Sequence, residues 1–130
     1  MVVADTDVLI TGFDRRREPE RARLFALLRR GELATTVINV FELTAGQSTT
    51  PSKLEQLHAA LGQVTVLPVT QGAAELAAAV SRHLGRRGLN LAPPDLLIAG
   101  VCLANGLPLL TRNVEHFGRV PGLVLEQLPG

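Results

Sequence analysis

Short apolar runs alternate with helix-forming segments along the whole of this 130-residue chain. The runs are rich in valine and leucine and are bounded by polar residues or glycine, which is typical of short strands buried on both faces. Such strands, separated by helices, indicate a parallel sheet that is covered by helices on both sides, an α/β fold. We predict strands at 2–4, 33–36, 64–69, 108–110 and, at an edge of the sheet, 124–128.

The segments between these strands have the spacing of helices that present one apolar side to a core. In the segment 18–30, Ala22, Phe25 and Leu28 form the predicted inner stripe, with Leu24 as a further candidate. We predict helices at 7–11, 18–30, 37–45, 52–61, 71–84 and 95–104, a basic loop at 85–88 and a polar turn at 111–117.

The length and composition of the chain favour one domain. With 46% hydrophobic residues it has enough apolar surface for one core but not for two ordinary domains, so we predict a single domain at 1–130. No apolar run reaches the roughly 18 residues that cross a bilayer, and the opening residues lack the pattern of a secretory signal. We therefore expect a cytoplasmic protein in which the single cysteine, Cys102, is a core residue rather than a nucleophile.

Three carboxylates lie in or beside apolar runs, where a charge is costly. They are Asp5 in Val-Val-Ala-Asp-Thr-Asp, Glu42 in Val-Phe-Glu-Leu and Asp95 before Leu-Leu-Ile-Ala, and these runs contain neither lysine nor arginine. A buried charge is strongly unfavourable unless it is paired, neutralised or bound to a metal. A divalent cation shared by all three acids would compensate them, and oxygen-only ligation suits Mg²⁺ or Mn²⁺. The pattern therefore favours a metal-dependent enzyme.

Each acid also has an ordinary structural explanation. Asp95 follows Pro94 and is placed to cap a helix, Asp5 can form a turn with its own backbone, and Glu42 can lie on the exposed side of an amphipathic helix. The three converge only if the sheet brings distant segments together. Asp5 follows a predicted strand, which places it at the carboxyl edge of a parallel sheet, where functional groups gather.

Four segments, in their order along the chain, resemble the successive motifs of the PIN-domain nucleases. They are Val-Ala-Asp-Thr-Asp-Val-Leu-Ile at 3–10, Val-Phe-Glu-Leu at 40–43, Pro-Asp-Leu-Leu-Ile-Ala at 94–99 and Leu-Thr-Arg-Asn-Val-Glu-His-Phe at 110–117. Within that family the chain is most similar to the VapC-type toxins of bacterial and archaeal toxin–antitoxin systems, including the Arg-Val-Pro-Gly-Leu ending at 119–123. Any one motif is weak, but four in order at this length are fairly specific.

The resemblance implies a three-layer α/β/α fold with a central parallel sheet of four to five strands. It also implies a ribonuclease that depends on Mg²⁺ or Mn²⁺ and uses a metal-activated water to attack an RNA phosphodiester. Asp5, Glu42 and Asp95 match the acids that hold the metal. Thr6 and Asp7 match positions that orient the first acid, although Asp7 is equally well placed to cap the following helix.

The last motif departs from the family pattern. Many PIN domains have a further acid in this turn, whereas this chain offers Asn113, Glu115 and His116. We predict that Asn113 positions a ligand or a water, which adds it to the three acids as a catalytic residue. Because a neutral amide stands where a fourth charge is common, we expect one tightly held metal rather than two.

Basic and aromatic residues limit how RNA is held. Lys53 is the only lysine, and the chain has neither tryptophan nor tyrosine, so a platform for stacking successive bases is not expected. Arg112 and the arginines at 15–17 are candidates for contacts with flanking phosphates. A solvated helix face explains the arginine cluster equally well.

The family likeness also implies partners. It implies a homodimer and a cognate antitoxin whose C-terminal segment covers the acidic site, often with an arginine, a group that carboxylates attract. The predicted helices that carry Leu9, Phe13, Leu24 and Leu28 offer an apolar groove for that segment. Burial in the core explains the same four residues equally well.

Two other functional classes stay open. The spacing of Asp5 and Asp7 is that of the haloacid dehalogenase-type phosphatases, but that motif requires threonine or valine where Leu9 stands and a lysine that Lys53 is poorly placed to supply. The other alternative is a PIN-like binding module that is catalytically weak or inactive. The missing acid near Asn113 favours this module, and the three intact acids argue against it.

Overall fold

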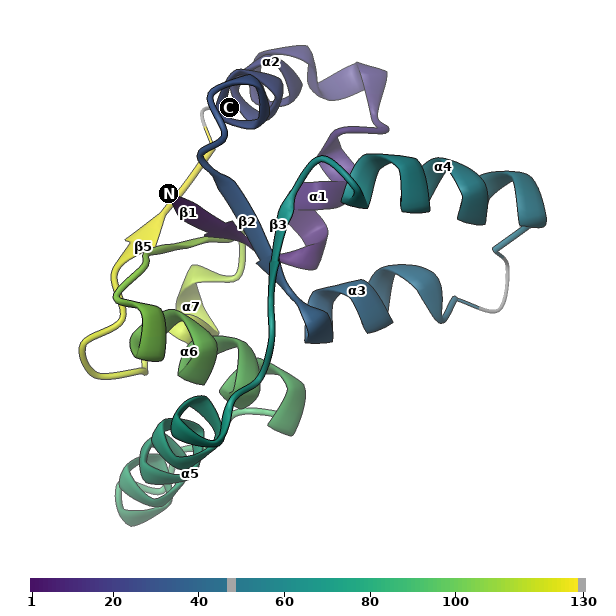
Figure 1. The fold of residues 1–130 in the computed structure, drawn as a ribbon. Coiled ribbons are helices and arrows are strands. Elements are labelled where there is room, and N and C mark those ends of the chain that lie inside the picture. Colours follow the sequence, from purple (N-terminus) through teal and green to yellow (C-terminus); the bar gives the residue numbers. More distant parts are fainter. Residues whose placement is uncertain (47–48, 129–130) are drawn as a thin grey trace.

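A five-stranded, all-parallel sheet forms the centre of the computed structural model, which describes residues 1–46 and 49–128 (Figure 1). The strand order is β3-β2-β1-β4-β5, so that β1 lies in the middle, and each neighbouring pair is parallel. The predicted α/β class and the parallel sheet are confirmed. The strands are β1 (Val2–Ala4), β2 (Leu33–Thr36), β3 (Thr65–Leu67), β4 (Leu109–Leu110) and β5 (Leu125–Glu126).

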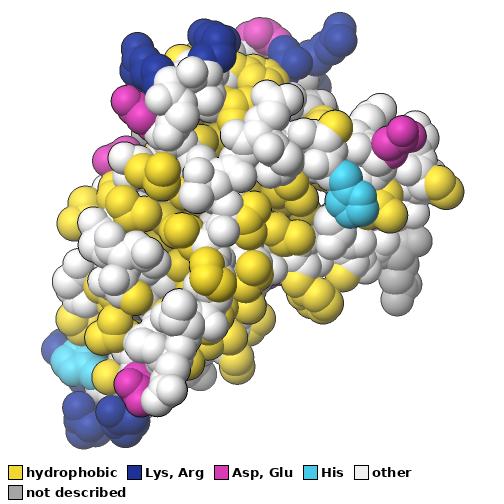
Figure 2. All heavy atoms as spheres, in the orientation of Figure 1, with side chains coloured by type: hydrophobic (Ala, Val, Ile, Leu, Met, Phe, Trp, Pro, Cys, Tyr) yellow, Lys and Arg dark blue, Asp and Glu magenta, His cyan; other side chains and the backbone are white. Residues whose placement is uncertain are grey.

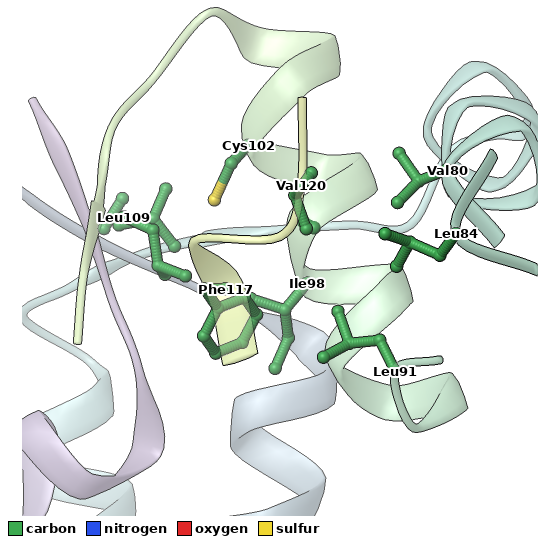
Figure 3. Close-up of a cluster of buried hydrophobic side chains, with 11 residues drawn as sticks. Val80, Leu84, Leu91, Ile98, Cys102, Leu109, Phe117 and Val120 are labelled. Atoms are coloured by element: carbon green, nitrogen blue, oxygen red, sulfur yellow. The ribbon is translucent and has the colours of Figure 1, made fainter. Parts of the chain in front are cut away.

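Helices cover both faces of this sheet, which makes the fold a three-layer α/β/α arrangement. On one face Ile98 and Phe117 pack against Leu109 of the sheet (Figure 3). On the other face Val8 and Leu27 belong to a second apolar cluster. No helix in the described ranges has the length and apolar character needed to cross a membrane. The helices are α1 (Thr6–Thr11), η1 (Arg15–Arg17), α2 (Glu18–Arg29), α3 (Val37–Thr44), α4 (Pro51–Leu61), α5 (Gln71–Arg86), α6 (Pro93–Asn105) and α7 (Val114–Phe117).

The central and edge strands differ in burial. In β1, Val3 belongs to one apolar cluster and Val2 and Ala4 belong to the other, because successive side chains of a strand point to opposite faces. In β3, Thr65 and Val66 are exposed. The expectation of strands buried on both faces is therefore wrong for β3, which lies at the edge of the sheet and is covered less completely.

The predicted inner stripe of α2 is displaced. The helix buries Leu24 and Leu27, whereas Phe25 and Leu28 are half-buried and Ala22 is exposed. Leu24 and Leu27 are three residues apart and share one side of the helix. They pack with the apolar cluster that includes the first strand, so the position of the sheet decides which of several apolar residues face inward.

The helix α5 is longer than predicted. It continues through Gly85 to Arg86, and the chain turns away near Gly88, whose φ is 70°. Leu84 in the last turn is fully buried, and this packing outweighs the low helix propensity of Gly85. The first half of the segment predicted as a loop at 85–88 therefore belongs to the helix, and the second half is a turn.

The predicted polar turn at 111–117 likewise contains a short helix, α7. Its last residue, Phe117, is fully buried in the same cluster as Ile98 of α6. Burial of this large side chain holds the turn against the core. The turn is therefore a fixed element at the edge of the sheet.

The helix α6 carries Asp95 in its first turn and is packed closely on α5. A Cβ added at Gly100 would lie 2.3 Å from the carbonyl oxygen of Ala73, so only glycine permits this approach. Cys102 of the same helix is fully buried, and burial raises the pKa of its thiol to about 12. Cys102 is thus a core residue and not a nucleophile, as predicted.

Candidate active site

Three neighbouring strands lead to polar residues at one edge of the sheet. Asp5 follows β1, Thr36 ends β2 and Thr111 follows β4. Because β2, β1 and β4 are adjacent and parallel, these residues lie at the same carboxyl edge. The sheet itself therefore brings together segments that are about a hundred residues apart in the chain, as the 106-residue separation of Asp5 and Thr111 shows.

Asp5 is fixed by three hydrogen-bond donors and is only 7% exposed. Its Oδ1 accepts from the backbone N–H of Thr6 (2.9 Å) and from Nδ2 of Asn39 (3.1 Å), and its Oδ2 accepts from Oγ1 of Thr111 (2.7 Å). The bond from Thr6 also makes Asp5 the N-cap of α1, so its local structural role is real. A carboxylate offers about four acceptor positions, and these donors leave one position on Oδ2.

Asn39, which the sequence analysis did not single out, connects this acid to β2. It is fully buried, and its Oδ1 accepts from the backbone N–H (3.3 Å) and the hydroxyl (2.7 Å) of Thr36. Its Nδ2 donates to Asp5 and also to Oγ1 of Thr6 (3.0 Å). The signal in the sequence was a threonine followed three residues later by asparagine, a capping box in which the amide replaces the usual glutamate or glutamine.

Glu42 approaches the site from the exposed side. Its Oε1 accepts from Oγ1 of Thr6 at 2.8 Å, so Thr6 joins Glu42 to the bonds around Asp5. The hydroxyl of Thr6 thus donates to Glu42 rather than to Asp5, and the predicted role of Thr6 in orienting the first acid stays a prediction. The side chain of Glu42 is nevertheless exposed, as its alternative explanation required.

Asp95 lies in the first turn of α6 and is half-buried. The N-cap of this helix is Ala92, so the alternative explanation of Asp95 as a helix cap is wrong: the two prolines start the helix before it. Burial raises the pKa of Asp95, and the negative charges of Asp5 and Glu42 raise it further, whereas His116 lowers it. Asp5 and Glu42 are therefore near enough to Asp95 for their charges to repel its own.

Asp7 lies beside this group. It is the second residue of α1, whose cap is Asp5, so its alternative role as a helix cap is wrong. Within the described ranges its Oδ1 is buried without a hydrogen-bond partner. Burial and the charge of Asp5 raise its pKa, and the charge of Arg112 lowers it. An unpartnered buried carboxylate oxygen is a further acceptor at this edge.

The turn after β4 joins the site through Asn113. Its backbone N–H donates to Oγ1 of Thr111 (3.0 Å), and its Oδ1 lies 2.6 Å from Nδ1 of His116. The side chain of Asn113 thus contacts the imidazole. Its predicted role in positioning a ligand or water stays a prediction. Glu115 and His116 are both exposed in α7.

Arg112 does not extend toward a substrate. Its Nη1 donates to the carbonyl oxygen of Asp7 (2.7 Å), and its Nη2 donates to Thr11 Oγ1 and Glu20 Oε2. These contacts tie the turn after β4 to α1 and α2, and they leave the predicted phosphate contact of Arg112 without structural support. The guanidinium instead makes hydrogen bonds within the protein, beside the acidic edge of the sheet.

Of the arginines at 15–17, Arg16 and Arg17 lie within salt-bridge distance of acids. Arg16 pairs with Asp14, and Arg17 pairs with Asp14 and Glu20. On the face shown in Figure 2, basic side chains gather over the region of α2 and near α5. All three arginines are exposed, and Arg15 is the one with no salt bridge among the described residues, which leaves it as a candidate for a phosphate contact.

The donors at the edge fit a hard divalent cation in their chemistry. They are carboxylate oxygens, and burial together with the charges of Asp5 and Glu42 raises the pKa of Asp95; a bound cation relieves such repulsion. Their spacing does not yet form a complete site, because no three His, Cys, Asp or Glu side chains of residues 1–46 and 49–128 are grouped closely enough to hold an ion. Glu42, the exposed member, is the acid with most freedom to move closer.

Known proteins and solved structures are similar to this chain over nearly its whole length. A VapC named as a tRNA(fMet)-specific endonuclease, from Salmonella typhimurium, is 29% identical over 125 residues, 94% of this chain and 93% of that protein. A solved structure of DNA-bound VapBC from Salmonella typhimurium has a TM-score of 0.81 and 26% identity, covering 98% of each chain.

A second solved structure, VapBC2 from Rickettsia felis bound to a DNA fragment from their promoter, agrees in fold. It has a TM-score of 0.83 over 99% of this chain and 100% of that chain, at 24% identity. A family model described as PIN domain matches residues 2–123. Since that match spans almost the whole sequence, the chain belongs to the PIN domain family.

Proposed function

We propose that this protein is a Mg²⁺- or Mn²⁺-dependent ribonuclease that cleaves RNA phosphodiester bonds and acts as the toxin of a toxin–antitoxin pair in the cytoplasm. Membership of the PIN domain family supports the proposal, as do the names of similar proteins, an endonuclease VapC and a ribonuclease VapC2. The observation that carries it is the acidic edge of the sheet. There Asp5 is fixed by three donors, and its charge raises the pKa of Asp95.

Asp5, Glu42 and Asp95 would hold the cation. When bound there, it would lower the pKa of a coordinated water and stabilise negative charge on the scissile phosphate. The chain's own contribution is orientation: Asn39 and Thr111 fix both oxygens of Asp5 before any ligand arrives. Such preorganisation reduces the reordering that binding requires.

Cleavage of RNA by purified protein, with and without a chelator, tests the activity. Asp5→Asn keeps the size of the side chain but removes its charge, and we expect it to lower the cleavage rate at least about 100-fold. Asp14→Asn is the matched control because Asp14 caps η1 and pairs with Arg16. Equal cleavage by Asp5→Asn, or cleavage that is unaffected by chelator, would refute the proposal.

A PIN-like binding module is the second candidate, because Asn113 is neutral and the acids do not form a complete group in this structure. Calorimetric titration with Mn²⁺ separates the two candidates. A ribonuclease of the proposed kind binds the ion, and Asp95→Ala weakens binding by one order of magnitude or more. Absence of both binding and cleavage in the wild type would favour the module.

The phosphatase alternative finds no support. The chain belongs to the PIN domain family, and Lys53, the only lysine, lies on α4 with Nζ 4.5 Å from the centroid of the Phe13 ring. In this contact the charged group of Lys53 lies over the face of an aromatic ring. Hydrolysis of a small chromogenic phosphate monoester by the wild type would reopen this alternative.

We propose a cognate antitoxin as partner, because the solved structures that this chain resembles include VapBC complexes. An apolar groove of about 160 Å³ between α1, α2 and α4 is suited to an apolar segment of that partner. Phe13 in this groove is 40% exposed, which ordinary core burial does not explain. Phe13→Asp should weaken the complex and leave RNA cleavage by the free protein unchanged. The groove is lined by Leu9, Gly12, Phe13, Leu24, Phe25, Leu28, Leu33, Ala60 and Val64.

A homodimer is the other proposed assembly. Val37 and Phe41, four residues apart on α3, are 41% and 67% exposed, and residues at this spacing share one side of a helix. Exposed apolar side chains of this size support a contact surface. Light scattering should give the mass of two chains for the wild type, and Phe41→Asp should shift the mass toward one. A single-chain mass for the wild type would refute the homodimer.

A further inference from the structure

His116 is connected to the first acid of the site by a continuous series of contacts. Oγ1 of Thr111 donates to Oδ2 of Asp5 (2.7 Å) and accepts from the backbone N–H of Asn113 (3.0 Å). Oδ1 of Asn113 then lies 2.6 Å from Nδ1 of His116. Each link is within hydrogen-bond distance, so the position of the imidazole is set relative to Asp5.

The contact with Asn113 also orients the ring chemically. An amide oxygen accepts hydrogen bonds, so it favours the form of His116 in which Nδ1 carries a proton. Nε2, the other ring nitrogen, makes no hydrogen bond within the described ranges, and the side chain is exposed. The imidazole is therefore fixed through one nitrogen and leaves the other available to a substrate.

His116 also acts electrostatically on one of the acids. Its charge lowers the pKa of Asp95, against the opposite effect of Asp5 and Glu42. Arg112 is closer in sequence to Thr111, but its guanidinium is bound to Asp7, Thr11 and Glu20. A proton donor for chemistry at this edge is thus supplied by His116 rather than by Arg112.

We propose that His116 is a catalytic residue that protonates the departing oxygen when the phosphodiester is cleaved; this inference rests on the ribonuclease function proposed above. The oxygen of the attacking water forms a new bond to phosphorus, and the bond from phosphorus to the departing ribose oxygen breaks. That oxygen takes a proton from Nε2 of His116, and the water releases one proton to solvent. His116 then regains its proton from solvent.

A leaving-group experiment tests this role. One substrate is an oligoribonucleotide that contains a cut site mapped with the wild type, and the other has sulfur in place of the departing oxygen at that site. A thiolate departs without a proton because thiols are far more acidic than alcohols. We expect His116→Gln to slow cleavage of the oxygen substrate about 100-fold and to change cleavage of the sulfur substrate less than about threefold.

His58→Gln is the matched control, since His58 is an exposed histidine on α4, and it should cleave both substrates at the wild-type rate. Equal slowing of both substrates by His116→Gln would show a structural or binding role and overturn the proposal. No slowing of either would overturn it as well. If the wild type cuts no RNA and no site can be mapped, the ribonuclease function itself fails, and that result is recognisable without any variant.

Discussion

Asp5 and Glu42, both assigned to the proposed metal site, are held in opposite ways. Asp5 is 7% exposed and receives hydrogen bonds on both oxygens, whereas Glu42 is exposed and is held by a bond from Thr6. A buried charge persists only where donors surround it, while an exposed charge is stabilised by water. The site therefore combines one fixed acid with one adjustable acid. Variants that remove hydrogen-bond donors to Asp5 test how firmly this acid is held, and variants of Glu42 test the exposed acid.

Among the variants around Asp5, Asn39→Leu should lower the stability of the protein most. The two side chains are similar in size, but leucine leaves Oδ1 of Asp5 one donor short and removes the acceptor of Thr36 in a fully buried place. Because unsatisfied buried groups cost about 1–3 kcal/mol each, the free energy of unfolding should fall by about 3 kcal/mol. Urea denaturation measures this. Asn105→Leu at an exposed position of α6 is the control and should cost under about 1 kcal/mol.

Thr111→Val should have the next largest effect. Valine has the same shape as threonine but cannot donate to Oδ2 of Asp5. Asp5 then receives hydrogen bonds on Oδ1 alone. The expected loss is about 2 kcal/mol in the free energy of unfolding. Thr65→Val on the exposed edge strand is the matched control and should stay within about 0.5 kcal/mol. Similar losses in Thr111→Val and Thr65→Val would mean that the hydrogen bond from Thr111 to Asp5 does not account for the loss of stability.

Asp95→Asn should make the protein more stable at neutral pH. Burial, Asp5 and Glu42 raise the pKa of Asp95 above its ordinary 3.8. The folded protein then binds more protons than the unfolded chain just above pH 3.8, so stability falls as the pH rises through the raised pKa. Asp95→Asn has no ionisable group at this position, so it does not lose this stability as the pH rises. Its thermal midpoint should exceed that of the wild type at pH 7, and the difference should be smaller at pH 4; an equal difference at both pH values would contradict the prediction.

Glu42→Gln should change stability least. The side chain is exposed, so the free energy of unfolding should stay within about 0.5 kcal/mol of the wild type. RNA cleavage should nevertheless fall at least tenfold, because the variant loses a negative charge from the proposed metal site. The matched control is Glu55→Gln, an exposed glutamate on α4. A large loss of stability in Glu42→Gln would show that Glu42 is a fixed acid like Asp5.

Much of the fold was predictable because it depends on local pattern. Each of the five strands lies within a run identified from its apolar residues, and the burial of the central strands between two helical layers follows from a parallel sheet. The errors occurred where tertiary packing overrides local preference. Leu84 holds α5 helical past Gly85, and Phe117 fixes a helix in a stretch that is polar in sequence.

The site was predictable only in part. Asp5, Glu42 and Asp95 stood out because charges in or beside apolar runs are rare, and burial together with the charges of Asp5 and Glu42 raises the pKa of Asp95. Asn39 did not stand out, because an asparagine near the start of a helix resembles an ordinary cap. Its partner Asp5 is 34 residues away, and no local pattern reports a bond over that separation.

The sequence by itself determined the α/β class, the strand positions and the identity of the acids, because these depend on hydrophobic patterning and on the cost of a charge among apolar residues. Only the tertiary structure decided what surrounds each acid. Thr111 faces Asp5, while its neighbour Arg112 binds Glu20 and Asp7. Two adjacent residues thus serve different parts of the site, because side-chain direction and partner distance are set by the folded sheet and helices.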